Sequence, residues 1–266
     1  MAKPFVNPFV SGQFLELRVD VLVSDGRGLG RHDGVVVLVE DALPGQLVRA
    51  RVAAVRKSLA EAALVEVLER SPDEQEPPCP HAGRCGGCSW QSLAYGRQLA
   101  WKERIVHDAL ERVGKVACPP MLPILPSPSE WGYRNKMEFA FGVSGDGGKA
   151  LGLRERGSRN IVEVTGCLLQ TPLTMRVLEA VRMLSNGAFH DLDGRFLVVR
   201  EPNAGGCFVE LIVGAGGSLE AGERFAEALR AETPEVTGFA LSERLAPSDV
   251  AYGERALYAD GRLEER

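Results

Sequence analysis

The sequence has no long apolar segment. No stretch of its 266 residues approaches the ~18 consecutive apolar residues that a membrane-spanning helix needs. The first residues, MAKPFVNPFV, also lack the uninterrupted apolar core of a signal peptide. We therefore expect a cytoplasmic protein with no membrane partner. In that reducing compartment, clustered cysteines more often bind metal or take part in chemistry than form disulfides.

A dinucleotide-binding glycine loop is also missing. Gly26, Gly28 and Gly30 have the spacing of the start of such a loop, but Arg31 stands where the last glycine should be. The residues that follow favour a strand rather than the required helix. We interpret the segment as a glycine-rich turn.

Neither sign of charge dominates the sequence. It has 31 Lys and Arg against 36 Asp and Glu, which gives a net charge of −5, but the charges are unevenly distributed. Residues 80–165 carry twelve basic and eight acidic residues, whereas 166–266 carry ten and sixteen. The negative total therefore excludes no nucleic-acid partner, and the basic middle region permits RNA binding.

Two domains are expected. Residues 14–70 alternate apolar and polar residues in short runs separated by Gly/Asp turns, which predicts an OB-like barrel of the kind that commonly binds oligonucleotides. The acidic, proline-rich run SPDEQEPP follows as a linker. We place the barrel in residues 1–72 and an α/β domain in residues 73–266, so that the predicted fold class is α+β.

The second predicted domain mixes helices and strands. Apolar residues recur at helical spacing from Ser92 to Val113, and Gly114 ends that helix. MEFAFGV and ALGLRE flank SGDGGK as a hairpin, and NIVEVTGC is a further expected strand. Helices over about 172–185 and 219–231 alternate with the strands FLVVRE, CFVELIV and VTGFALS.

Three of the six cysteines fall within CPHAGRCGGCSW, residues 79–90. Cys79, Cys85 and Cys88 lie among glycines that let the chain fold tightly, so their thiolates can converge on one centre. Cys167, after a predicted strand, is the best-placed fourth ligand. Cys118 and Cys207 have the surroundings of small buried residues instead.

This donor set suits two metal centres. An iron–sulfur cluster takes four thiolates, typically three close together and one remote, and is the favoured occupant. Zinc is the alternative, although it usually takes paired CxxC motifs and only one pair is present. A metal-free structural or redox loop is a third interpretation.

The chain resembles the bacterial 23S rRNA (uracil-5-)-methyltransferases. GRGLGRHDG, VVVLVEDALPGQLVRARV and AEAALVEVLERSPD are similar to the TRAM domain, an RNA-binding barrel. PPCPHAGRCGGCSWQSLAY and PSPSEWGYRNKMEFAF are similar to the cluster motif and to the strand that follows it. The resemblance implies a 4Fe-4S cluster on Cys79, Cys85, Cys88 and Cys167.

The same resemblance leads us to expect a missing catalytic part. Uracil C5 methylation needs a cysteine nucleophile, a base and S-adenosylmethionine, which the family holds in a C-terminal Rossmann-like domain. The chain ends at ALYADGRLEER, where that domain would begin, and no Gly-rich strand–turn–helix for the donor is found. We therefore expect no Rossmann-like methyltransferase domain, no catalytic residues, and S-adenosylmethionine binding only if that domain is supplied.

Two functions remain open on this basis. The chain is expected to be the RNA-binding, iron–sulfur portion of the methyltransferase and inactive alone. It is then either a fragment or the product of a gene whose catalytic part, a possible partner, is encoded separately. The alternative is a stand-alone RNA-binding or RNA-chaperone protein, and an iron–sulfur redox sensor is a weaker third. Both the methyltransferase portion and the RNA-chaperone protein would have RNA as their partner. For the methyltransferase portion, which is the favoured interpretation, we expect ribosomal RNA.

Basic and aromatic residues supply the predicted RNA contacts. Candidate phosphate contacts on the barrel are Arg27, Arg31, Arg49, Arg51, Arg56 and Lys57. Arg31, Arg51 and Lys57, together with Arg134 and Lys136 of the YRNK motif, form the predicted RNA-binding set. Candidate base-stacking residues are Phe14, Trp90, Tyr95 and Trp101, although core packing is favoured for Trp101.

Overall fold

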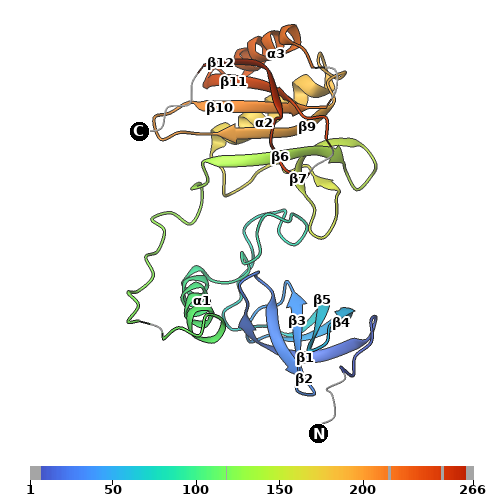
Figure 1. The fold of residues 1–266 in the computed structure, drawn as a ribbon, viewed down its shortest axis with the longest axis vertical. Helices are drawn as coiled ribbons and strands as arrows, with labels where there is room; N and C mark the ends of the chain where they lie inside the picture. Colours follow the sequence, from blue (N-terminus) through green and yellow to red (C-terminus); the bar gives the residue numbers. More distant parts are fainter. Residues whose placement is uncertain (1–6, 118, 215–216, 247–248, 262–266) are drawn as a thin grey trace. The chain divides into compact units, whose positions relative to one another are not determined.

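The computed structural model describes residues 7–117, 119–214, 217–246 and 249–261. The elements form two compact units (Figure 1), one of Met1–Ala82 with Cys88–Ser127 and the other of Gly83–Gly87 with Pro128–Arg266. Among the described residues, no helix is both long enough and apolar enough to cross a membrane. Cys118, which was predicted to be a small buried residue, lies outside the described residues.

The first unit is built on a closed five-stranded barrel with strand order β1-β2-β3-β5-β4. Buried and exposed residues alternate along β1 and β4, so that one face of each fills the barrel and the other faces solvent. Small and β-branched side chains fill the interior, as the narrow lumen requires. The predicted barrel is confirmed. Its strands are β1 (Phe14–Leu22), β2 (Gly28–His32), β3 (Val35–Glu40), β4 (Leu47–Val55) and β5 (Leu59–Glu69).

Glycine is required at two points of the barrel. Asp33 and Gly34 connect β2 to β3 with φ values of 50° and 81°, and this left-handed pair suits a tight hairpin turn. A Cβ at Gly30 would lie 2.2 Å from the carbonyl oxygen of Arg18. β1 and β2 can therefore approach this closely only because residue 30 has no side chain.

The predicted helix over Ser92–Val113 begins at Tyr95. α1 (Tyr95–Asp108) continues as the π-helical turn η1 (Ala109–Val113). Trp101 is buried, as predicted, and packs with Leu22 of β1, Leu43 and Leu93. This cluster attaches the helix to the barrel, so the compact unit extends past the boundary predicted at residue 72, which marks only the end of the barrel.

The second unit contains a seven-stranded sheet of order β12-β11-β10-β9-β6-β7-β8. β10 and β11 run parallel, and the other described strand pairs of this sheet are antiparallel. The predicted hairpin around SGDGGK is the β6–β7 pair. The strands are β6 (Lys136–Val143), β7 (Lys149–Arg154), β8 (Ile161–Val162), β9 (Gly194–Arg200), β10 (Cys207–Val213), β11 (Val236–Glu243) and β12 (Arg255–Gly261).

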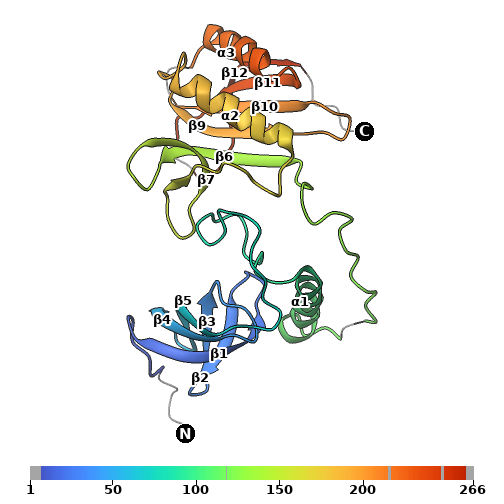
Figure 2. The ribbon, with the colours of Figure 1, turned by 180° about the vertical axis from the view of Figure 1, so that it is seen from behind.

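Two helices cover one face of this sheet (Figure 2). α2 (Pro172–Asn186) is capped by Thr171, and α3 (Leu219–Glu232) by Ser218, each through a hydroxyl that accepts a backbone N–H of the first turn. The helices bury their apolar sides against the sheet in one large cluster, in which Phe139, Leu197 and Phe225 are fully buried. The predicted helices over 172–185 and 219–231 are thus present.

The residues ALYADG, 256–261, form most of β12, which pairs with β11. β12 has no buried residue, so its sequence carries little of the alternation that marks a strand. Polar contacts hold it: the Asp260 carboxylate accepts hydrogen bonds from Arg230 Nη1 at 2.7 Å, the Phe239 backbone N–H at 3.1 Å and the Tyr258 hydroxyl. The Arg230 guanidinium lowers the pKa of Asp260 to about 2.

Candidate functional site

One predicted RNA contact, Arg51, lies beside an exposed aromatic ring. Arg51 of β4 is directly opposite Phe14 of β1 in the antiparallel register. Leu15 and Ala50, their buried neighbours, point into the barrel, so Phe14 and Arg51 share its outer face. Phe14 is 60% exposed, which leaves its ring open to a stacking partner.

The barrel's arginines divide into paired and unpaired groups. Arg49 contacts Glu16 at 2.8 Å and Glu66 at 2.9 Å. Arg27 contacts Asp25 at 2.6 Å and Arg56 contacts Glu61 at 3.4 Å. Within the described part of the chain, no carboxylate pairs with the remaining three cations of the barrel set, which are Arg31, Arg51 and Lys57. Those three keep their charge available for phosphate.

The three unpaired cations come from different parts of the barrel. Arg51 lies on β4 and Lys57 in the turn that follows it, whereas Arg31 lies on β2, on the other side of β1. Arg31 Nη1 donates a hydrogen bond to the Gly34 carbonyl oxygen at 3.1 Å, which orients its guanidinium. Arg51 and Lys57 thus belong to the surface of β4 and the turn that follows it, and Arg31 belongs to the neighbouring surface of β2.

The predicted pair Arg134 and Lys136 lies at the start of β6. The backbone N–H of Arg134 donates to Leu169 O at 3.0 Å, which fixes the strand entry. The Lys136 ammonium contacts the Glu138 carboxylate, so its charge is partly neutralised. Lys136 stands directly opposite Arg200 of β9, an exposed cation that the sequence motif did not indicate.

Aromatic residues on the barrel unit are mostly engaged. The Trp90 indole N–H donates to Gly26 O at 3.0 Å, the Tyr95 hydroxyl accepts the Ser127 N–H at 2.8 Å, and Trp101 is buried. Of the four predicted stacking residues, Phe14 is therefore the best placed to meet a base.

The glycine-rich cysteine loop is fixed by backbone pairing around Cys85. Gly86 N–H donates to Arg154 O at 3.0 Å, and Arg156 N–H donates to Arg84 O at 2.9 Å. Gly87 N–H points at Cys85 Sγ, 3.4 Å away, the kind of contact that stabilises a thiolate ligand. Cys85 and Cys167 both pack against the large core cluster of the second unit.

The four predicted metal ligands are cysteines, and each is partly exposed. Cys79 and Cys88 belong to the first compact unit, and Cys85 and Cys167 to the second. The donor set suits an iron–sulfur cluster in its chemistry. In the described ranges, however, no three His, Cys, Asp or Glu side chains are already arranged to hold a metal ion.

Cys207 differs from the other described cysteines. It is fully buried in β10, as its sequence context indicates. Burial raises the pKa of its thiol to about 12. With its side chain fully buried and its thiol pKa raised, Cys207 is not placed to act as a nucleophile or a ligand.

Comparison with known proteins supports the barrel assignment and extends it. Residues 8–65 match the TRAM domain. An "Uncharacterized RNA methyltransferase" of Nitratidesulfovibrio vulgaris is 44% identical over 97% of this chain and 57% of its own length. The 23S rRNA (uracil(1939)-C(5))-methyltransferase RlmD of Acidithiobacillus ferrooxidans is 37% identical over 69% of this chain and 41% of its own length.

A solved structure shares the fold. The tRNA (uracil-54, C5)-methyltransferase of Pyrococcus abyssi, in complex with S-adenosyl-L-homocysteine, matches with a TM-score of 0.66 and 22% identity. The match covers 94% of this chain and 57% of that one. The chain thus spans less than two thirds of the length of the relatives it matches.

These matches correct two expectations from the sequence. A chain with no Rossmann-like methyltransferase domain was expected, but 94% of the chain matches the solved structure of a methyltransferase, over 57% of that protein. The functions drawn from that absence, an inactive RNA-binding portion or a stand-alone RNA chaperone, lose their basis, because a relative matched along 97% of the chain is named an RNA methyltransferase. Nothing in the comparisons calls for a separately encoded catalytic partner.

Proposed function

We propose that this protein takes part in S-adenosylmethionine-dependent methylation of RNA at uracil C5. The observation that carries the proposal is the exposed Phe14–Arg51 pair on a barrel that matches the TRAM domain. An open aromatic ring beside an unpaired guanidinium offers a stacking surface and a phosphate contact together. Those are the two elements that single-stranded RNA recognition requires.

The substrate class follows from the names of the relatives. One acts on a uracil of 23S rRNA and another on a uracil of tRNA. We propose ribosomal RNA as the substrate, because the relative with the higher identity is the ribosomal enzyme. The RNA contacts proposed for this chain are Arg31, Arg51, Lys57 and Arg134, with Arg200 added from the structure; Lys136, predicted with them, is paired with Glu138.

The reaction needs a thiolate that attacks C6, a methyl donor at C5 and a base that removes the C5 proton. Cys207 is fully buried in β10, so it is not placed to act as that nucleophile. The role that we give to the described residues is to hold the RNA strand so that the target uridine is presented. S-adenosylmethionine supplies the methyl group.

We also propose that Cys79, Cys85, Cys88 and Cys167 hold a 4Fe-4S cluster. The support is chemical: four partly exposed cysteines, three of them in a glycine-rich loop, and an N–H directed at Cys85 Sγ. Uracil methylation requires no electron transfer, so the cluster's role is structural. Zinc is the alternative occupant, and metal analysis would distinguish it from an iron–sulfur cluster.

Deletion of the gene tests the proposed function. Ribosomal RNA and transfer RNA from the deletion strain should be digested and mapped for 5-methyluridine by mass spectrometry. We expect one 5-methyluridine of the large-subunit RNA to disappear while transfer RNA is unchanged. Loss from transfer RNA alone would correct the substrate, and unchanged 5-methyluridine in both RNAs would refute the function.

A further inference from the structure

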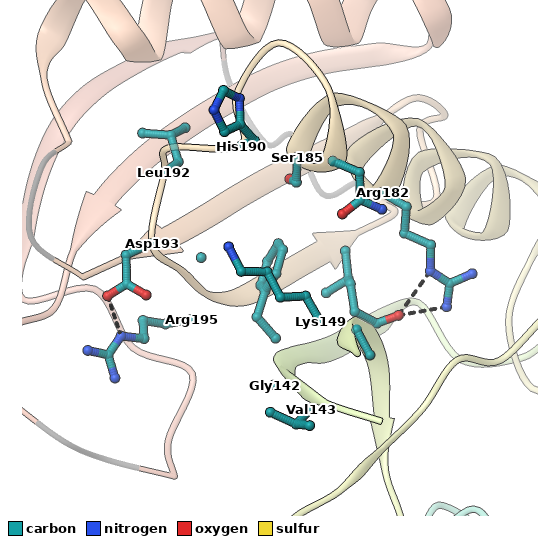
Figure 3. Close-up of a pocket in the computed structure, with 14 residues that line it drawn as sticks. Gly142, Val143, Lys149, Arg182, Ser185, His190, Leu192, Asp193 and Arg195 are labelled. Carbon is teal, nitrogen blue, oxygen red and sulfur yellow. Dashed lines mark hydrogen bonds and ion pairs between the residues drawn. The ribbon is translucent and has the colours of Figure 1, made fainter. Parts of the chain in front are cut away.

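The second unit contains a pocket. Its lining includes none of the residues that were proposed above as RNA contacts or metal ligands. It has a volume of about 340 Å³ and lies between the β6–β7 hairpin and the segment that joins α2 to β9 (Figure 3). One part of its lining is apolar, from Phe141, Val143, Leu151 and Leu192. The other part is polar and carries Lys149, Ser185 and His190.

The two arginines of the pocket are already engaged. Arg182 donates from Nε and Nη2 to Leu151 O at 2.9 and 2.7 Å, and from Nη1 to Val164 O at 3.1 Å. These hydrogen bonds give Arg182 a structural role in the pocket wall. Arg195 Nε lies 3.2 Å from the Asp193 carboxylate, so the one carboxylate that lines the pocket is neutralised there.

Lys149 supplies a cation without a counterion. In Figure 3 its ammonium extends into the pocket between Asp193 and Ser185. Its backbone is held opposite Val143 at the end of the β6–β7 ladder. The described residues give the ammonium no ion-pair or hydrogen-bond partner. A compact, unpaired ammonium beside hydroxyl and imidazole groups suits a phosphate oxygen.

The apolar part of the pocket lining includes the flat aromatic ring of Phe141. A Cβ at residue 194 would lie 2.9 Å from three different atoms of the Phe141 ring, so the ring lies flat against the Gly194 backbone. Glycine at this position leaves room for the ring. A ring held in this way gives the pocket a firm apolar surface suited to a planar group.

We propose that this pocket binds one unstacked nucleotide of single-stranded RNA. The phosphate is held by Lys149, and the base packs against the apolar wall that includes Phe141 and Leu192. Pockets of small ligands begin at about 300 Å³, and the observed 340 Å³ is of the size that one nucleotide needs. The inference rests on the proposed function, in which RNA is the partner. It adds a nucleotide-binding pocket in the second unit to the RNA contacts proposed above.

The test uses the full chain and a fluorescein-labelled hexauridylate in anisotropy titrations. Lys149→Gln should weaken binding roughly tenfold and lower the log–log salt slope by about 0.7, the share of one phosphate contact on a single strand. The matched control is Lys102→Gln, an exposed lysine of α1 that also lacks a described partner. It should change affinity by less than about twofold.

A second arm tests the base. Wild-type protein should bind hexauridylate more tightly than an abasic ribose-phosphate hexamer of equal charge. Gly194→Ala, whose Cβ displaces the Phe141 ring, should reduce that preference. Equal losses for the two lysine variants, or no preference for bases, would overturn the inference.

The outcomes separate this inference from the proposed function. If Arg51→Gln weakens RNA binding while Lys149→Gln does not, the pocket assignment fails and the barrel surface stands. If the wild-type chain binds no RNA, the proposed function fails. Displacement of the hexamer by uridine 5′-monophosphate at an equal or lower concentration would identify a free nucleotide as the ligand and overturn the RNA assignment.

Discussion

At the residue scale, the decisive property of a cation is whether a carboxylate already neutralises it. Arg49 and Arg51 are two positions apart in the same strand and look alike in the sequence RARV. The first is held by Glu16 and Glu66, and the second faces solvent beside Phe14. That difference depends on the register of β1 and β5 against β4, which no local pattern shows.

This contrast gives a matched pair of variants. Arg51→Gln should weaken RNA binding about threefold to tenfold and reduce the salt slope by about 0.7 to 0.9, because one phosphate contact is lost. Arg49→Gln should leave affinity nearly unchanged, since its charge is already paired. Salt-dependent anisotropy titrations measure both. Equal effects of the two variants would show that the ion pairs do not select the RNA contacts.

The cysteine set makes a second prediction at this scale. Protein purified without oxygen should be brown, absorb near ~400 nm and contain about four irons per chain. Cys88→Ser should lose the iron, while Cys118→Ser, outside the proposed ligand set, should keep it. Metal analysis by mass spectrometry gives the answer. One zinc per chain and no iron would replace the cluster with a zinc site.

At the element scale, the sequence predicted those elements that bury one face. The barrel strands, the β6–β7 hairpin, α2 and α3 all have strong alternation or helical spacing. β12 lacks both and is fixed by Asp260, Arg230 and Tyr258. The pocket around Lys149 was equally hidden, because it joins residues such as Lys149 and His190 that lie far apart in sequence.

The Asp260 contacts predict a pH dependence. The pKa of Asp260 is about 2 in the folded chain, against an ordinary value of 3.8, so its ionised form is favoured by folding. The stability that this contributes is complete above about pH 4 and is lost as the pH falls from 3.8 toward 2. Asp260→Asn should lower the Tm at neutral pH and flatten the Tm profile in that window. Thermal unfolding across pH measures it, and an unchanged acid profile would contradict this account of β12.

The barrel closure makes a separate prediction. Gly30→Ala places a Cβ 2.2 Å from Arg18 O and forces β1 and β2 apart, which should cost more than about 3 kcal/mol of unfolding free energy. The control is Gly34→Ala, where no atom lies within 4 Å and only the positive φ is strained, at a cost of about 1 kcal/mol. Urea denaturation compares them. Equal losses would mean that close approach does not govern the barrel.

At the scale of the whole molecule, the proposed RNA contacts lie in both compact units. The first offers Phe14, Arg51 and Lys57, and the second offers Arg134, Arg200 and the pocket around Lys149. The expectation of no Rossmann-like methyltransferase domain drew on local sequence signals, the glycine-rich strand–turn–helix above all, and such signals do not report fold similarity. Fold similarity extends along 94% of the chain without that motif.

The central claim is that the Phe14–Arg51 surface serves uracil methylation of RNA. The most direct measurement is 5-methyluridine occupancy at the affected site in the deletion strain, complemented with the wild-type gene or with the double variant Phe14→Ala, Arg51→Gln. Wild type should restore full occupancy, and the double variant, expressed at an equal level, should leave most of the site unmethylated. Full methylation with the double variant would contradict the account.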